Sequence, residues 1–332
     1  LLLRDPRLEV AFLEVARGGI LRRGLPLRRA RAALVTNVAS DHLGQYGVNT
    51  LQALTETKFA VSRTLAENGV LVVNADDAGI VEYLAQQDRQ NLCWFSLDKS
   101  NPRIRYQLDN RGRCCFVDAD EIVSFDGISE ERICAIKDIP MTMNGAALHN
   151  VRNALGAAGV ASAMQYTSAQ IREGLCRFNS DERDNPGRLN SFVLQNGAHV
   201  IVDFAHNAHS VEAVTDTVRR MPAKHKWALF GSAGDRSDDE IAAIASGVCS
   251  LAPDHVVITE IEQYLRGRAN GEVGAIMKQA CLDNGIADDR IHLAESPMAG
   301  VSFALSRMQG DDLGLFLVLS QREQIIDYLN SH

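Results

Sequence analysis

The sequence alternates short apolar runs with amphipathic segments of helical spacing, and this alternation limits the possible folds more than any other feature. In the first half we expect strands at 8–15, 31–36 and 69–73, and helices at 51–67 and 78–87. Strands that alternate with helices are typical of a parallel sheet covered by helices on both faces. The first half therefore predicts an α/β domain.

Residues 91–145 have a different pattern. Short alternating pieces, LCWFSL, IRYQLD, RCCFVD and EIVSFDG, are separated by polar turns. Such pieces favour an antiparallel extension of the sheet. Two helices are expected next, at 146–164 and 168–177.

A polar stretch, NSDERDNPG at 179–187, separates the two halves and is our predicted linker. We therefore expect one domain at 1–178 and another at 188–332. In the second domain the α/β alternation resumes, which predicts a doubly wound, Rossmann-like fold. Its strands are expected at 198–204, 226–230, 255–260 and 314–319, and its helices at 210–219, 239–250, 271–283 and 298–307.

Composition limits the partners and the compartment. The 332 residues suffice for two cores, and 34 Lys+Arg against 42 Asp+Glu give a net charge of −8. This acidity argues against nucleic acid or an anionic membrane as the main partner, because both reward basic surfaces. The chain has no apolar run long enough for a membrane span. Its seven cysteines form no C-x-x-C pair, so we expect a cytoplasmic protein with reduced thiols.

Metal-capable and anion-binding residues follow the predicted strands where each strand ends. In an open parallel sheet, ligands collect at the carboxyl ends of the strands. These residues alone predict metal-assisted chemistry on an anionic ligand. They are Glu14, Asn37 with Asp41 and His42, Asn74 to Asp77, Asp203 to Asn207, and Gly231 to Arg236.

Each of these residues also has an ordinary structural interpretation. Glu14 could be a surface carboxylate, and His42 a loop residue. The Asn74–Asp77 run could be a turn followed by a helix N-cap. Lys58 would usually be a solvated charge on a helix. On the residues alone, these alternatives stay open.

The order and spacing of several segments resemble the Mur ligase family across nearly the whole chain. Two of them, ARGGILR and YLRGRANGEV, are more similar to the cyanophycin synthetases of that family than to the peptidoglycan ligases. The matching segments are EVARGGILRRGL (14–25), TNVASDHLGQYGVNTL (36–51), LTETKFAV around Lys58, VVNADD (72–77), LHNVRNALGAAG (148–159), NPGRLN (185–190), VDFAHNAHSVEA (202–213), FGSAGDRSDDEI (230–241) and YLRGRANGEV (264–273).

The resemblance implies a central ATP-binding domain, N-terminally truncated here, and a C-terminal Rossmann-like domain. It also implies an ATP- and Mg²⁺-dependent reaction that joins a carboxylic acid to an amine through an acyl phosphate. Metal ions and cationic side chains would offset the repulsion between the carboxylate and the triphosphate. For the cyanophycin type, the expected product carries arginine on the side-chain carboxyl of an aspartate, so the partners are an aspartate/arginine-type substrate or polymer. A homo-oligomer is also expected.

For the metal, the resemblance assigns Glu14, His42 and Lys58. Lys58 corresponds to a lysine that the family carbamylates, and a carbamate is an anionic oxygen ligand suited to magnesium. A neutral imidazole such as that of His42 is an unusual magnesium ligand, since hard cations prefer oxygen. The alternative for Lys58 is an unmodified, structural lysine.

For ATP, the resemblance assigns Asn150 and Asn153 to the adenine, Arg188 to the phosphates, and Asp203 to the ribose or γ-phosphate. The catalytic residues would be Lys58, His42 and Arg188. The expected substrate residues are His206, Asn207, Asp235, Arg236, Arg266 and Arg268.

The sequence also departs from the family. It contains no Gly-Lys-Thr-type phosphate-binding loop, and it begins at Leu1 without an initiator methionine. We expect that loop upstream and this chain to be the later part of a longer ligase, possessing little activity alone. Phe204 and Ala208 stand where the family usually has tyrosine and proline. Two alternatives stay open: a non-catalytic scaffold or polymer-binding module, and another Mur-type ligase of folylpolyglutamate or peptidoglycan type.

Overall fold

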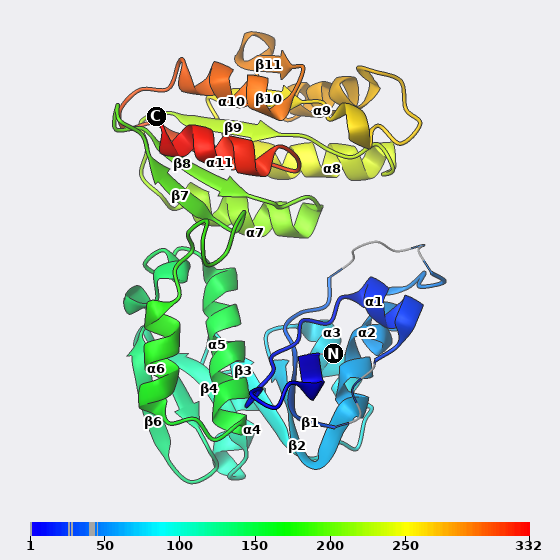
Figure 1. Ribbon diagram of the computed structural model, residues 1–332, viewed down its shortest axis with the longest axis vertical. Coiled ribbons are helices and arrows are strands. Elements are labelled where there is room, and N and C mark those ends of the chain that lie inside the picture. Colours follow the sequence, from blue (N-terminus) through cyan, green and yellow to red (C-terminus); the bar gives the residue numbers. More distant parts are fainter. Residues whose placement is uncertain (1, 26, 28, 40–43, 45) are drawn as a thin grey trace. The chain divides into compact units, whose positions relative to one another are not determined.

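The structure, a computed structural model, describes residues 2–25, 27, 29–39, 44 and 46–332 (Figure 1). The chain divides into two compact units, each with one six-stranded sheet. Unit 1 comprises Leu1–Cys134 and Arg152–Arg172, and unit 2 comprises Ala135–Val151 and Glu173–His332. The domain limits and the linker at 179–187 stay predictions.

Unit 1 is built on a sheet of order β1-β2-β3-β4-β5-β6. Strands β1 to β4 pair in parallel, and β5 pairs antiparallel with β4. The strands are β1 (Ala30–Val35), β2 (Leu65–Asn74), β3 (Leu92–Ser96), β4 (Arg113–Asp118), β5 (Glu121–Phe125) and β6 (Glu130–Ala135). The helices of unit 1 are α1 (Arg17–Arg23), α2 (Leu51–Lys58), α3 (Ala78–Ala85) and α4 (Pro102–Asp109). Unit 1 also contains most of α5 (Leu148–Ala163) and the first half of α6 (Ser168–Arg177), whose remaining residues belong to unit 2.

The core of unit 1 lies on both faces of its parallel strands. In β2, Leu71, Val72 and Val73 are fully buried, as expected for a strand covered on both sides. Helix α5 packs closely on one face, where a Cβ atom added to Gly159 would lie 2.8 Å from Val72 Cγ1. A glycine at this position lets the helix approach the sheet.

Two expectations for unit 1 are wrong. The strand expected at 8–15 does not form: residues 8–16 are in neither helix nor strand, and Phe12 is 66% exposed. Alternating apolar residues make a strand only when a neighbouring strand pairs with them, and among the described residues this segment has no such neighbour.

The second wrong expectation is a strand at IRYQLD, which belongs to α4 instead. A helix is favoured over a strand here because Asn101 caps it, accepting a hydrogen bond from Arg103 N–H at 2.9 Å, and because Pro102 occupies its first turn. The helix expected at 51–67 is also shorter, because a 3-10 turn at Phe59–Thr64 leads directly into β2.

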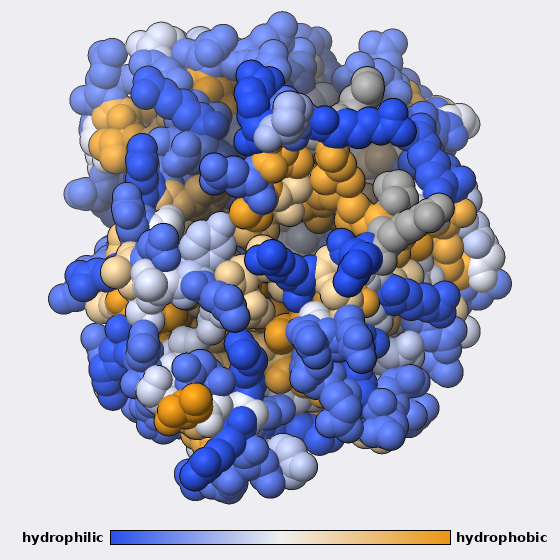
Figure 2. All heavy atoms as spheres, turned by 60° about the horizontal axis from the view of Figure 1, so that its bottom comes forward, coloured by the Kyte–Doolittle hydropathy of each residue, from blue (hydrophilic) through white to orange (hydrophobic). Residues whose placement is uncertain are grey.

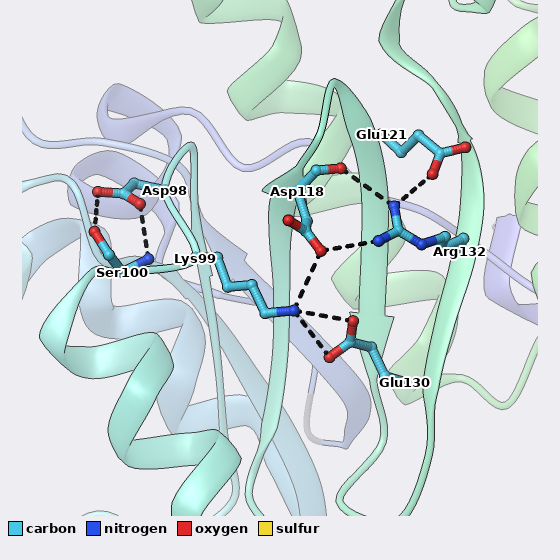
Figure 3. Close-up of polar contacts among 7 residues, drawn as sticks. All are labelled: Asp98, Lys99, Ser100, Asp118, Glu121, Glu130 and Arg132. Carbon is cyan, nitrogen blue, oxygen red and sulfur yellow. Dashed lines mark hydrogen bonds and ion pairs between the residues drawn. The ribbon is translucent and has the colours of Figure 1, made fainter.

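The antiparallel part of unit 1 is cross-linked by ion pairs (Figure 3). Lys99 Nζ lies 3.2 Å from carboxylate oxygens of both Asp118 and Glu130. Arg132 pairs with Asp118 at 2.9 Å and with Glu121 at 2.5 Å. These side chains connect β4, β5 and β6 with the loop before α4, and their exposure keeps the stabilisation modest.

Unit 2 contains a sheet of order β11-β10-β9-β12-β8-β7, parallel except for the β7–β8 pair. The four predicted strands and four predicted helices of this half are present. The strands are β7 (Asn190–Val193), β8 (His199–Asp203), β9 (Lys226–Phe230), β10 (His255–Thr259), β11 (Ile291–Ala294) and β12 (Leu313–Leu317). The helices are α7 (Ala208–Arg219), α8 (Asp238–Cys249), α9 (Glu272–Asp283), α10 (Pro297–Leu305) and α11 (Arg322–Asn330).

The sheet of unit 2 buries a core on each face. Phe230 and Ile258 belong to one cluster of buried side chains, and Phe316 and Val257 to the other. Neighbouring residues of a strand point to opposite faces, which explains the division. The α/β fold expected for both halves is therefore confirmed.

Outside these cores the surface is mainly polar. On the face in Figure 2, hydrophilic side chains predominate and hydrophobic ones form smaller groups between them. Within the part of the chain that the structure describes, no helix has the length and apolar character that a membrane span requires.

Candidate functional site

The exits of β1 and β2 lie side by side and are joined by polar side chains. Asn74 Nδ2 donates a hydrogen bond to Thr36 O at 3.0 Å. Asp77 Oδ2 accepts one from Val38 N–H at 2.7 Å. The residues after these two strands are therefore held together at the carboxyl edge of the unit 1 sheet.

Lys58 points to this edge. It is the last residue of α2 and is partly buried, and its Nζ donates a hydrogen bond to Asn37 O at 2.9 Å. The amine thus lies at the exit of β1 and not in open solvent. Carbamylation of Lys58 stays a prediction.

The two aspartates of the NADD run have structural contacts. Asp77 caps α3, because its Oδ1 accepts a hydrogen bond from Ile80 N–H at 3.0 Å. This confirms the N-cap interpretation of one aspartate. Asp76 accepts hydrogen bonds from Ser96 Oγ at 2.5 Å and Leu97 N–H at 2.9 Å, and lies 3.9 Å from Arg152 Nε. Asp76 therefore connects the exits of β2 and β3 with α5.

The predicted metal ligands are only partly described. Glu14 is exposed in the irregular segment 8–16, and His42 lies outside the described residues. Among the residues that the structure does describe, no group of three or more His, Cys, Asp and Glu side chains could hold a metal ion. The described residues alone do not complete a magnesium site, and the site of Glu14, His42 and Lys58 stays a prediction.

The two asparagines predicted for adenine lie on α5. Asn150 is 8% exposed, and its Nδ2 donates a hydrogen bond to Met141 O at 2.7 Å. Asn153, nearly one turn later, is exposed. Asn150 therefore anchors the loop before the helix, and the adenine contact of both residues stays a prediction.

In unit 2, Asp203 is a buried carboxylate at the end of β8 and is only 4% exposed. Its Oδ2 accepts a hydrogen bond from Leu189 N–H at 2.9 Å, and its Oδ1 accepts one from Ala205 N–H at 2.7 Å. Burial raises the pKa of Asp203, while these bonds and the charge of Arg188 act in the opposite direction. The exposed Arg188 is thus placed next to the β8 exit.

The loop after β8 is ordered by its own hydrogen bonds. His206 is partly buried, and its Nδ1 lies 3.0 Å from Phe204 O, a contact that places the proton on Nδ1. Asn207 caps α7, because its Oδ1 accepts a hydrogen bond from Ser210 N–H at 2.9 Å. Asn207 therefore has a structural function, and a substrate contact would be additional.

Arg268 joins two loops of unit 2. Its guanidinium donates hydrogen bonds to Gly234 O at 3.0 Å and Arg236 O at 2.8 Å. It also forms ion pairs with Asp238 and Glu272, each at 2.7 Å. These contacts favour a structural role for Arg268 over the predicted substrate contact.

The other predicted substrate residues lie on the same two loops. Asp235 and Arg266 are exposed, and Arg236 is partly buried. The Arg266 guanidinium lies 5.6 Å from the centre of the Tyr264 ring. Their substrate roles stay predictions.

A cavity of about 730 Å³ opens at the carboxyl ends of β8, β10, β11 and β12, and no local sequence pattern predicted it. Four carboxylate side chains line it, with Arg322 as the single cation among the lining residues. These carboxylates, Glu260, Glu262, Glu295 and Glu323, are spread over three strand exits, so only the fold brings them together. The cavity favours a cationic ligand.

Comparison with known families gives two matches. The family model for the Mur ligase middle domain matches residues 1–161, and the model for the Mur ligase glutamate ligase domain matches residues 187–317. Cyanophycin synthetase of Trichormus variabilis is 33% identical over 83% of this chain and 30% of its own length. That of Crocosphaera subtropica is 31% identical over 97% of this chain and 36% of its own length. The chain thus spans about a third of these relatives.

More distant similarities point to the same fold. UDP-N-acetylmuramate–L-alanine ligase of Clostridium novyi is 28% identical over 59% of this chain and 39% of its own length. The structure of MurF from Acinetobacter baumannii has a TM-score of 0.61 at 17% identity, covering 91% of this chain and 60% of that chain. The E. coli FolC structure with DHPP and ADP has a TM-score of 0.63 at 15% identity, covering 91% of this chain and 62% of that chain.

Proposed function

This chain belongs to the Mur ligase family, and from that premise we propose that it is the part of an ATP-dependent ligase that forms an amide bond. The two family models at 1–161 and 187–317 carry the proposal. Identities of 31% and 33% with cyanophycin synthetases, against 28% with a peptidoglycan ligase, support the cyanophycin type.

The proposed reaction has two steps. A carboxylate oxygen of the acid attacks the γ-phosphorus of ATP, the bond from that phosphorus to ADP breaks, and an acyl phosphate forms. The amine nitrogen then attacks the acyl carbon, phosphate leaves with the attacking oxygen, and the amine loses a proton. Cationic groups must reduce the repulsion between carboxylate and triphosphate in the first step.

The described residues suit this chemistry at two places. The Lys58 side chain lies at the exit of β1. We propose that it faces the reacting carboxylate and triphosphate there, either as a protonated amine or as a carbamate. Arg188 is exposed beside buried Asp203, so its guanidinium is available to phosphate oxygens. We propose that magnesium, held in part by residues outside the described set, supplies further neutralisation.

For the amine we propose arginine, and for the acid an aspartate side chain. The acidic cavity of unit 2 supports this choice, because Glu262 and Glu295 line it together with two further carboxylates. A planar guanidinium pairs with carboxylates through two parallel hydrogen bonds. An incoming acidic amino acid would instead be repelled there.

The test is a product assay with the intact protein that contains this chain. With ATP, magnesium, arginine and a short aspartyl peptide, we expect ADP and a peptide heavier by one arginine, measured by mass spectrometry. Glu262→Gln and Glu295→Gln should raise the KM for arginine by about tenfold or more. Glu212→Gln, on the exposed face of α7, is the matched control and should leave it unchanged.

Two results would count against the proposal. Absence of any ATP-dependent product favours a non-catalytic module. Product with another amino acid, but none with arginine, favours a different Mur-type ligase.

A further inference from the structure

A second cavity of about 730 Å³ lies in unit 1 at the edge of the sheet opposite to Lys58 and Asn74. It is formed at the amino ends of β3 and β4 and at the carboxyl ends of α3 and α4. Its volume is in the range of small-molecule sites. Nothing in the proposed ligase reaction uses this edge.

Four arginines line this basic cavity, with Asp126 as the single carboxylate among the lining residues. The arginines are Arg89, Arg103, Arg111 and Arg113. The cavity lining thus carries an excess of positive charge, whereas the whole chain has a net charge of −8. A concave, basic surface raises the local concentration of anions.

The carboxylate of Asp126 interacts mainly with its own turn, and its charge acts on Arg113 only as a smaller effect. Its Oδ1 accepts hydrogen bonds from Ile128 N–H at 2.7 Å and Ser129 N–H at 2.8 Å, within its own turn. The bond from Ser129 is the main reason that the pKa of Asp126 is lowered. Among the described residues, no ion pair joins any of the four arginines to a carboxylate.

Arg89 is partly desolvated, and no carboxylate of the described part of the chain forms an ion pair with it. Its guanidinium donates hydrogen bonds to Ser62 Oγ at 3.0 Å and Ser62 O at 2.9 Å. Burial lowers the pKa of Arg89, whereas carboxylate partners raise the pKa values of Arg132 and Arg268. A bound anion would supply the missing compensation.

Helix α4 presents one polar face to the cavity. Arg103, Tyr106, Gln107 and Asn110 all line it, and their spacing places them on the same side of the helix. The Arg103 guanidinium lies 5.6 Å from the centre of the Trp94 ring, a cation–π contact that fixes its direction. The donors are therefore partly preorganised.

An alternative to ligand binding is that arginines at the carboxyl end of a helix donate hydrogen bonds to its last carbonyl groups. The contacts here differ from that case. Tyr106 O accepts hydrogen bonds from the backbone and side chain of Asn110, and Gln107 O accepts one from Gly112 N–H at 2.8 Å. These two carbonyls of the last turn are thus satisfied without the guanidinium groups.

We propose that this basic cavity binds a small multivalent anion, with two or more carboxylate or phosphate groups, at a site separate from the ligase centre. A guanidinium group can donate two parallel hydrogen bonds to a carboxylate or to a phosphate. Four arginines around one cavity therefore favour a ligand with more than one negative charge. Occupation of this edge gives the protein a means to respond to an acidic peptide or a phosphorylated metabolite.

The test is isothermal titration calorimetry of the intact protein at low salt, without magnesium, using tripolyphosphate and tri-aspartate as separate probes. We expect saturable binding of at least one probe. Arg103→Gln and the double variant Arg111→Gln/Arg113→Gln should weaken it by about tenfold or more. Arg105→Gln, on the exposed side of the same helix, is the matched control and should change it by less than about twofold.

A Lys58→Ala variant separates this site from the ligase centre and should keep the binding. A preference for one probe identifies the ligand as a phosphate or a carboxylate compound. Circular dichroism should give the same spectrum for all variants, and the salt dependence of binding by the unaltered protein provides a readout that needs no substitution. Absence of saturable binding for both probes, equal weakening by Arg105→Gln, or loss of binding in Lys58→Ala would overturn the proposal.

Discussion

Asp203 offers a sharp test of the structure of unit 2. Its carboxylate is buried at the end of β8 and accepts two backbone hydrogen bonds, one on each oxygen. Replacement with alanine leaves the N–H groups of Leu189 and Ala205 without this acceptor. Replacement with asparagine keeps one acceptor oxygen and places an N–H₂ group against the second donor.

The structure gives the expected magnitudes. An unsatisfied buried donor costs about 1–3 kcal/mol, so Asp203→Ala should lower the free energy of unfolding by about 2–6 kcal/mol. Asp203→Asn should be more stable than the alanine variant by about 1–3 kcal/mol, because one hydrogen bond survives.

The pH dependence has a definite sign. Burial raises the pKa of folded Asp203 above its usual 3.8, so the folded state holds this proton more tightly than the unfolded state. The stability that this linkage contributes is fully present below about pH 3.8 and is lost as the pH rises through the folded pKa. The advantage of the unaltered protein over either variant should therefore shrink as the pH rises from about 3 to 7.

The assay is urea unfolding followed by tryptophan fluorescence. The chain has two tryptophans, and Trp227 is buried in the core of unit 2. In a Trp94→Phe background, the signal therefore reports on unit 2 alone. An advantage that grows with pH, or equal stability of the alanine and asparagine variants, would refute the reasoning.

Three further perturbations follow from local contacts. Arg268→Ala should lower the melting temperature and speed proteolysis in the loop at 262–271, because the hydrogen bonds to Gly234 and Arg236 are lost, whereas Arg266→Ala should change neither. Overpacking in Gly159→Ala should lower the free energy of unfolding by about 1–3 kcal/mol, and with it the melting temperature, because the new Cβ would lie 2.8 Å from Val72 Cγ1. An unchanged melting temperature would contradict the close packing of α5. Arg132→Gln should lower the melting temperature only slightly, and this effect should fade at high salt. A salt-independent loss of stability would contradict an exposed ion pair.

The fold of unit 2 could be predicted from sequence because its parallel strands are continuous apolar runs. The strand expected at 226–230 coincides with β9, Lys226–Phe230. Four-residue strands such as β7 and β11 were missed, because so few residues carry too little pattern. The run at 8–15 has the pattern of a strand, but pairing decides whether a strand forms, and pairing is not visible in one segment.

The candidate site could be predicted from the sequence about as well as the fold. Residues directly after a strand, such as Asn74 and Asp203, could be placed at a carboxyl edge from the α/β alternation. Ser96, Arg152 and Glu295 were missed, because distant segments bring them to the edge. Their contribution depends on tertiary packing, which no local pattern encodes.

The most direct test of the proposed ligase follows oxygen from substrate to phosphate. The intact protein is given ATP, magnesium, arginine and an aspartyl peptide whose side-chain carboxyl carries ¹⁸O. Attack of the carboxylate on the γ-phosphorus predicts one ¹⁸O atom in each phosphate released, measured by mass spectrometry. Amide product formed together with unlabelled phosphate would contradict an acyl phosphate and, with it, the proposed reaction.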